Sequence, residues 1–192
     1  MRSIVLVATL LVALAAPRAA DATIIIPKNL KELAAEAELV LVAEVTGQRA
    51  DRVAGPESLI YTFSALRVLE QWKGAKTDRL EVAEVGGRVG DVTCFAAGMP
   101  QYKVGERVLV FLKKDVLGLW RTHGLVQRRF AVQKNVATGD DVVRLEKGLE
   151  HVTREHLAAA EVNAGGTVEL ETFAARAREL IAQAARAQGE KR

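Results

Sequence analysis

The sequence contains few of the residues that cross-link small domains or mark a specialised surface. It has one cysteine, Cys94, four prolines and only 5% aromatic residues. Because a single cysteine cannot form an internal disulfide, the fold must depend on packing alone. Neither sign of charge dominates, since the formal net charge is only +3. A nucleic-acid binder carries a concentrated basic surface, so we expect no nucleic-acid partner.

The only long hydrophobic run stands at the start of the chain. Residues 4–16 are almost entirely apolar, Arg2 precedes them, and Ala20 and Ala22 supply small residues at the −3 and −1 positions of a cleavage site. This layout is typical of a secretory signal peptide over residues 1–22. The run is shorter than the roughly 20 residues that span a bilayer. We therefore predict a periplasmic or secreted protein that begins at Thr23 and has no membrane span after cleavage.

Short β-type segments dominate the chain after a short amphipathic helix. Asn29 and Glu32 form a capping-box pattern at the start of that helix, which ends near Ala37. Apolar and β-branched segments bounded by glycine and polar turns then predict strands. The predicted strands are 39–46, 59–72, 78–85, 91–97, 107–112, 117–122, 127–133 and 141–145.

The pattern of these strands favours a small barrel. In 59–72 the apolar alternation changes phase at Ala65–Leu66, which requires a bulge. Bulged, coiled strands close small barrels, and the spacing does not fit a parallel α/β sheet. We predict a mainly β fold with flanking helices. Its centre is an OB-like, closed or partly open β-barrel over residues 23–145.

The C-terminal part of the chain, after residue 145, lacks the strand pattern. Residues 146–169 predict a loop or weak helix, and residues 170–192 predict a helix with a short frayed tail. In this helix Phe173, Ala177 and Leu180 share one face with Ile181 and Ala184 at helical spacing. A polar loop is expected earlier in the chain, over Gln48–Ser58.

Cys94 has two interpretations. It could act as a nucleophile served by His123 as base and Asp91 as orienting group. No local signature surrounds it, and a lone cysteine between apolar neighbours is more often a small buried hydrophobe or a free thiol. We favour the second interpretation.

Other patterns that suggest chemistry do not meet its requirements. His151 and His156 would project about 140° apart on a helix and could not share one metal ion. Gly86–Gly90 lacks the G-K-[ST] ending of a phosphate loop and predicts a turn or bulge. Ser58 and Ser64 lack a G-x-S-x-G context. We therefore expect no catalytic residues, no metal site and no cofactor.

A group of basic and aromatic residues suggests a ligand face. OB-type barrels bind oligonucleotides or oligosaccharides through faces that combine these residue types. Solvated charges that protect strand edges are the alternative. The candidate residues are Arg107, Arg121, Arg128 and Phe130.

Several segments together resemble a group of uncharacterised bacterial exported proteins, over residues 29–133. These segments are 30–45, 61–63 with 72–74, 86–90, 100–112, and 124–127 with 130–132. More distantly, the strand plan is similar to netrin-like modules, which include the tissue inhibitors of metalloproteinases. The resemblance implies an OB-fold barrel. Those inhibitors chelate the protease zinc with a disulfide-bonded N-terminal cysteine, whereas the expected N-terminus here is Thr23, so their mechanism does not transfer.

These observations predict an exported, non-enzymatic binding or interaction domain. Its expected partner is an exported protein or an envelope component. The alternative is an inhibitor or assembly partner of an exported protease, presenting Thr23–Pro27 or the Gln48–Ser58 loop. A Cys94/His123 enzyme is the third hypothesis.

Overall fold

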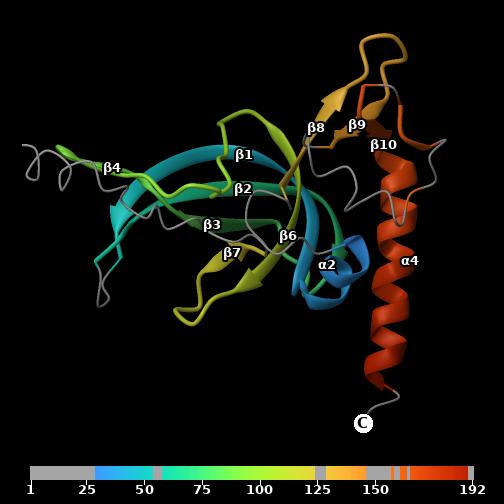
Figure 1. Cartoon of the computed structure of the whole chain (residues 1–192), viewed down its shortest axis with the longest axis horizontal. Coiled ribbons are helices and arrows are strands. Elements are labelled where there is room, and N and C mark those ends of the chain that lie inside the picture. The colour runs from blue at the N-terminus through green and yellow to red at the C-terminus, as the bar shows by residue number, and fades with distance from the viewer. Residues whose placement is uncertain are drawn as a thin grey trace, which may run out of the picture.

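The computed structural model describes residues 29–53, 58–123, 129–145, 157, 161–163 and 165–189. Figure 1 shows a curved sheet with one short helix and one long helix beside it. The predicted mainly β fold, with a helix before the first strand and a helix at the C-terminal end, is confirmed. The elements are α2 (Leu30–Glu36), β1 (Leu39–Arg52), β2 (Ile60–Lys73), β3 (Arg79–Val85), β4 (Gly87–Val89), β5 (Val92–Cys94), β6 (Arg107–Lys114), β7 (Trp120–Thr122), β8 (Arg129–Lys134), β9 (Asp141–Arg144), β10 (Thr167–Glu169) and α4 (Leu170–Gly189).

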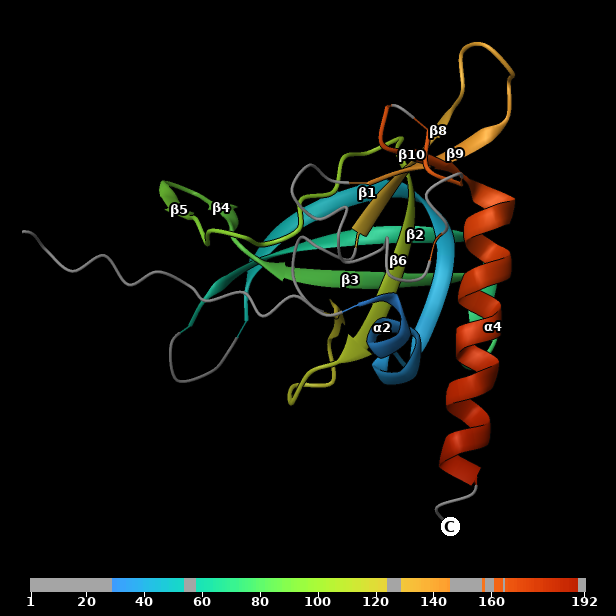
Figure 2. The same cartoon turned by 45° about the vertical axis from the view of Figure 1, so that its right-hand side comes forward.

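Five strands pair into a ring. β1 pairs antiparallel with β2 on one side and with β6 on the other. β2 also pairs with β3, and β6 also pairs with β7, both in antiparallel orientation. The ring closes where β3 meets β7 in parallel, at a single bridge between Val82 and Trp120. Strands β8, β9 and β10 extend the sheet beyond the ring from β6, as Figures 1 and 2 show.

Bulges give β1 and β2 the curvature that the ring needs. Val45 lies opposite Leu66 and Gly47 lies opposite Ala65, so Thr46 is an extra residue on β1. The bulge predicted at Ala65–Leu66 of β2 is therefore present at this position of the β1–β2 pair. The extra residue, however, is Thr46 of β1 and not a residue of β2. Extra residues of this kind bend a strand and increase its twist.

One core fills the interior of the ring. Along β6, Val108, Val110 and Leu112 point inward and are fully buried. They meet inward side chains of β1, β2 and β3, as period-2 alternation requires. The buried members of this cluster are Leu39, Leu41, Ala43, Val45, Leu66, Val82, Tyr102, Val108, Val110 and Leu112.

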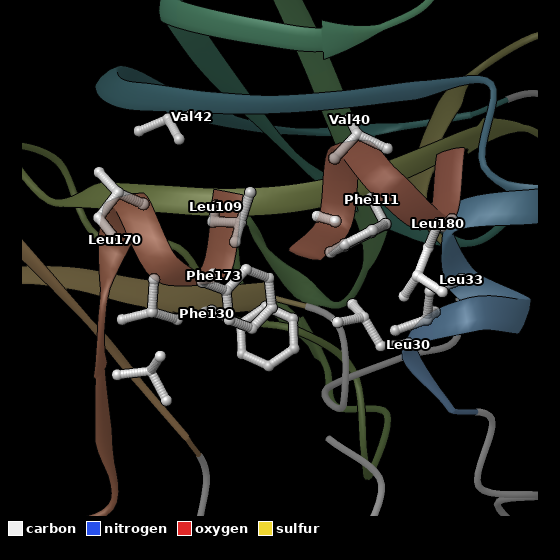
Figure 3. Packing of buried hydrophobic residues seen from close by; sticks show 14 of the residues in the cluster. Leu30, Leu33, Val40, Val42, Leu109, Phe111, Phe130, Leu170, Phe173 and Leu180 are labelled. Atoms are coloured by element: carbon white, nitrogen blue, oxygen red, sulfur yellow. The ribbon is translucent and has the colours of Figure 1, made fainter. Parts of the chain in front are cut away.

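A second core lies between the outer face of the ring and the two helices (Figure 3). Leu109 and Phe111 point to this side from β6, which explains why the strand is apolar on both faces. Phe173 of α4 packs against Phe130 of β8 with ring centroids 5.4 Å apart, and Phe130 packs against Phe111 at 6.2 Å. The predicted apolar face of the C-terminal helix, including Phe173 and Leu180, is buried here.

Helix α2 is fixed at both ends. The Asn29 side chain accepts from the backbone N–H of Glu32 at 3.0 Å, and the Glu32 carboxylate accepts from the Asn29 N–H at 2.9 Å. This is the predicted capping box. At the other end, Lys73 Nζ of β2 donates to the carbonyl oxygens of Ala34 and Ala35 at 2.8 and 3.0 Å. The lysine thus ties the C-terminal turn of the helix to the sheet.

Three local predictions are wrong. Gly87–Val89 forms strand β4, which pairs with β5 as a hairpin, where Gly86–Gly90 was predicted to be a turn or bulge; the turn itself lies at Gly90–Asp91. The predicted strand 91–97 shortens accordingly to Val92–Cys94. β1 continues to Arg52, because β2 pairs with it from Val40 to Arg52. Residues 48–52 of the predicted Gln48–Ser58 loop are therefore strand, while residues 54–57 lie outside the described residues.

The remaining predictions concern the region before α4 and the membrane. Thr167–Glu169 forms β10, a strand inside the predicted loop or weak helix of 146–169; most of that segment lies outside the described residues. Residues 1–28, with the predicted signal peptide, also lie outside them. No helix in the described part of the chain is long and apolar enough to cross a membrane.

Candidate functional site

A cavity of about 280 Å³ lies between the ring and the connection from β5 to β6. In Figure 1 this connection arches over β1 before it enters β6. The volume is near the lower end of small-molecule pockets, which span about 300–1,000 Å³. The lining residues are Gln48, Thr62, Ser64, Glu84, Val85, Gly86, Gly87, Cys94, Phe95, Ala96, Met99, Pro100, Gln101 and Tyr102.

The bulge in β1 anchors the roof of the cavity. Val45, next to the extra residue, donates its N–H to the carbonyl of Glu106 at 2.9 Å and accepts from Gly105 at 2.8 Å. Tyr102 is buried, and its hydroxyl shares a hydrogen bond of 2.7 Å with the Thr122 hydroxyl of β7. The roof is therefore held to two strands of the ring.

A glycine pair gives the cavity its side wall. Gly86 and Gly87 have φ values of 124° and 125°, in the region that favours glycine. A β-carbon on Gly87 would lie 2.6 Å from the Thr62 hydroxyl oxygen. The glycines therefore let the backbone leave β3 and run close against β2 before it enters the β4–β5 hairpin.

Glu84 is the buried charge of the site. Only 4% of the residue is exposed. Its carboxylate accepts from the backbone N–H of Thr122 at 2.7 Å and from Arg121 at 3.3 Å. Burial raises the pKa of Glu84, while the bonds from Thr122 and the charge of Arg121 oppose this rise. The carboxylate stands just past the single β3–β7 bridge, so it replaces backbone pairing at the joint of the ring.

A ring of polar groups continues from Glu84 along the wall. Gln48 Nε2 donates to the Ser64 hydroxyl at 3.0 Å and to the carbonyl of Tyr102 at 2.9 Å. The Thr62 hydroxyl donates to the carbonyl of Gly86 at 2.8 Å. Burial, strengthened by the negative charge of Glu84, raises the pKa of the Tyr102 hydroxyl, which stays protonated at neutral pH. The wall is polar, and its groups are fixed by internal hydrogen bonds.

The predicted ligand face of Arg107, Arg121, Arg128 and Phe130 is not one surface. Phe130 is 4% exposed and belongs to the outer core, because β8 is covered by α4. Arg107 binds Asp141 of β9 through two hydrogen bonds of 2.6 and 2.9 Å, and this arginine lowers the pKa of Asp141. Arg128 lies outside the described residues.

Arg121 is likewise engaged in ion pairs and is no open ligand contact. Besides Glu84 it contacts Asp115 at 3.4 Å, and its guanidinium lies 5.2 Å from the ring centre of Tyr61. Its side chain is 20% exposed. The periodicity of β7 could indicate which face Arg121 occupies. Its acidic partners, however, come from β3 and from the turn between β6 and β7.

Cys94 is a free thiol, as predicted, but the expectation that it is a buried hydrophobe is wrong. It is partly exposed and lines the cavity. The nucleophile hypothesis also lacks its base. His123 Nε2 lies 2.7 Å from a Glu36 carboxylate oxygen of α2, and α2 and the β4–β5 hairpin lie on different sides of the molecule in Figures 1 and 2. The fold thus separates His123 from Cys94, while Asp91 lies in the hairpin turn.

The described residues contain no group of three or more His, Cys, Asp or Glu side chains that could hold a metal ion. His151 and His156 lie outside the described residues. No family model and no curated protein matches this chain. The resemblance to exported proteins and netrin-like modules therefore remains a prediction, and function has to be inferred from the cavity itself.

Sequence reasoning missed the residues that shape this cavity. The signal for Glu84 was present, because alternation in β3 puts it on the inward face with Leu80 and Val82. A carboxylate at an inward position is rare without a partner or a role. Tyr102 lies between two predicted strands, and no sequence pattern links it to Gln48 or to Thr122.

Proposed function

We propose that this protein is an exported, non-enzymatic binding domain with an OB-like barrel, and that its ligand occupies the cavity under the β5–β6 connection. The strand order β1-β2-β3-β7-β6, with β6 returning to β1 and a parallel β3–β7 contact, supports the OB-like assignment. The N-terminal signal-peptide pattern supports export.

The observation that carries the proposal is a rigid polar wall beside an exposed aromatic side chain. Ser64, Glu84 and Tyr102 are all buried and hydrogen-bonded. Phe95, which also lines the cavity, is 78% exposed. Convergent polar groups fix the orientation of a ligand, and an apolar side chain that is otherwise unburied gains contact area when a ligand covers it.

A binding role fits these groups better than catalysis. Both carboxylate oxygens of Glu84 already accept hydrogen bonds. Cys94 is the only cysteine of the chain, and the described part of the cavity lining contains no histidine or lysine that could activate it. Fixed groups without an acid–base pair favour recognition.

The test is a fragment titration followed by NMR. Fragment hits on the isotope-labelled protein should shift amide signals of cavity residues, above all Phe95 and Gln101. Alkylation of Cys94 with a bulky maleimide should abolish these shifts by filling the cavity. The Cys94→Ala variant treated with the same reagent is the matched control and should keep them. Hits that avoid the cavity, or that survive alkylation, would contradict the proposal.

The protease-inhibitor alternative keeps its own test. Its first contact segment, Thr23–Pro27, lies outside the described residues, and the first five residues of the second, 48–52, belong to β1. Incubation with exported metalloproteases would support it if activity fell in proportion to added protein. Unchanged activity at molar excess would remove it.

A further inference from the structure

We infer that the cavity recognises a cationic amine, that is, an ammonium group on a short aliphatic stem. This inference rests on the proposed function, because it names the chemical class of the ligand in the same cavity. Three observations lead to it: the hydrogen-bonding capacity of the wall, its charge, and its apolar rim.

On the ring side of the cavity, most side-chain hydrogen-bond donors already donate to acceptors within the protein. Both Gln48 Nε2 bonds go to protein acceptors, and the Thr62 hydroxyl donates to Gly86. The Tyr102 hydroxyl is paired with Thr122. Among these wall groups only the Ser64 hydroxyl hydrogen has no assigned acceptor.

Acceptor capacity, in contrast, remains. The Glu84 carboxylate accepts from the Thr122 N–H and from Arg121, and the Thr122 hydroxyl adds a further hydrogen bond. Since a carboxylate offers about four acceptor directions, about one remains for a ligand. The Gln48 side-chain oxygen and the lone pairs of Thr62 add to this side. A ligand group that donates several hydrogen bonds satisfies such a wall, and an ammonium group donates three.

The charge of the cavity lining also favours a cationic ligand. Among the described residues that line the cavity, Glu84 is the only charged one. Arg121 approaches it from β7 and is shared with Asp115, so this arginine and its two carboxylates carry a net negative charge. A carboxylate or phosphate ligand would meet Glu84 with no basic side chain in the lining to offset the repulsion. A cation gains from the same field.

The apolar lining sets the rest of the ligand. Val85, Phe95, Met99 and Pro100 lie around the cavity, and Phe95 is the most exposed of them. An aliphatic stem would cover these side chains while its ammonium group reached Glu84. The cavity volume of about 280 Å³ has room for an ammonium group on a stem of a few carbons.

The experiment compares three probes of equal length, namely pentylammonium, 1-pentanol and pentanoate, on the purified protein near pH 7. The first readout is the rate at which neutral iodoacetamide alkylates Cys94, followed by mass spectrometry. The second is the amide shift map. Pentylammonium should slow alkylation at a concentration about tenfold below that of pentanoate, the ratio expected for one charge-assisted hydrogen bond.

Glu84→Gln should weaken protection by pentylammonium about tenfold and leave 1-pentanol unchanged. Glu81→Gln is the matched control, because Glu81 lies on the outer, exposed side of the same strand. Should Glu84→Gln fail to fold, the three-probe comparison on the unmodified protein still decides the question.

The outcomes separate the two proposals. Tighter binding of 1-pentanol or pentanoate in the cavity would overturn the amine assignment and leave the binding role intact. Protection by none of the three overturns the amine assignment, whereas the fragment titration alone decides whether the cavity binds ligands at all.

Discussion

At the scale of single residues, Glu84 links the joint of the ring to the cavity. Its carboxylate accepts a hydrogen bond from the backbone N–H of Thr122, beyond the single bridge that joins β3 to β7. The same side chain also lines the cavity. A buried carboxylate is costly unless hydrogen bonds compensate it. Thr122 and Arg121 supply that compensation here, so the same side chain serves the fold and the site.

The raised pKa of Glu84 predicts a pH dependence of stability. The folded state binds the Glu84 proton more tightly than the unfolded chain does. The free energy of unfolding should therefore fall as the pH rises from 4.5, the ordinary pKa of a glutamate, through the higher pKa of Glu84 in the folded state. Above that pKa the contribution is constant. Urea unfolding followed by tryptophan fluorescence, from pH 4.5 to about pH 8, measures this slope.

Two variants assign the slope to its residue. Glu84→Gln cannot titrate and should lose the slope, whereas Glu81→Gln, exposed on the same strand, should retain it. The lowered pKa of Asp141 acts in a different window, because its stabilisation is lost only as the pH falls below about 3.8. A slope that survives in Glu84→Gln would contradict this assignment.

The interaction partners of a residue could be predicted from the sequence only where those partners lie nearby in the chain. The capping box of Asn29 and Glu32 lies within one helical turn and was predicted. The arginines failed as a ligand face because Arg107 and Arg121 find carboxylates 34 and 37 residues away in the chain. Alternation along one strand carries no information about such partners.

At the scale of elements, long apolar strands were predictable and glycine-rich ones were not. β6 was found almost to the residue, since both of its faces are buried. β4 contains a glycine at positive φ and only three residues, so propensity argued for a turn. Pairing with β5 overrides that local preference.

Gly74, which follows β2, tests how closely the elements approach one another. Its φ is 95°, and a β-carbon there would overlap the Leu39 side chain and the Glu38 carbonyl oxygen. Gly118 has a similar φ of 77° but open space around it. Gly118→Ala should therefore cost about 1 kcal/mol of unfolding free energy from backbone strain alone.

Gly74→Ala adds the overlap to the strain, which should cost about 1–3 kcal/mol more. The difference between the two variants, measured by urea unfolding, isolates the packing of β2 against the start of β1. Equal losses would show that the chain near Glu38 relaxes freely, which the hydrogen bond from Glu38 N–H to the Leu112 carbonyl at 2.8 Å opposes.

At the scale of the whole molecule, the ring needs a cover on its outer face. Val40, Val42, Leu109 and Phe111 point away from the ring interior and would face water without α2, α4 and the β8–β10 extension. Sequence patterns predicted eight of the ten described strands in their order and missed β4 and β10. The ring closure between β3 and β7 depends on one bridge and one buried carboxylate. No local pattern encodes such a joint.

Helix α4 is therefore predicted to be part of the folding unit. Its buried residues are Leu170, Phe173, Ala174, Ala177 and Leu180. A chain that ends at Glu169 would leave the outer core uncovered, and loss of Phe173 alone would cost about 3–5 kcal/mol. Since domains are stable by only about 5–15 kcal/mol, this truncated chain should show no cooperative unfolding transition.

A chain that ends at Ala182 is the control, because it keeps every buried residue of α4. The described residues after it are half-buried or exposed, so this chain should fold with a loss of about 1 kcal/mol. Circular dichroism during heating distinguishes the two truncations. If the chain ending at Glu169 still unfolded cooperatively, the ring would be stable alone, and α4 would be a separate attachment to a finished domain.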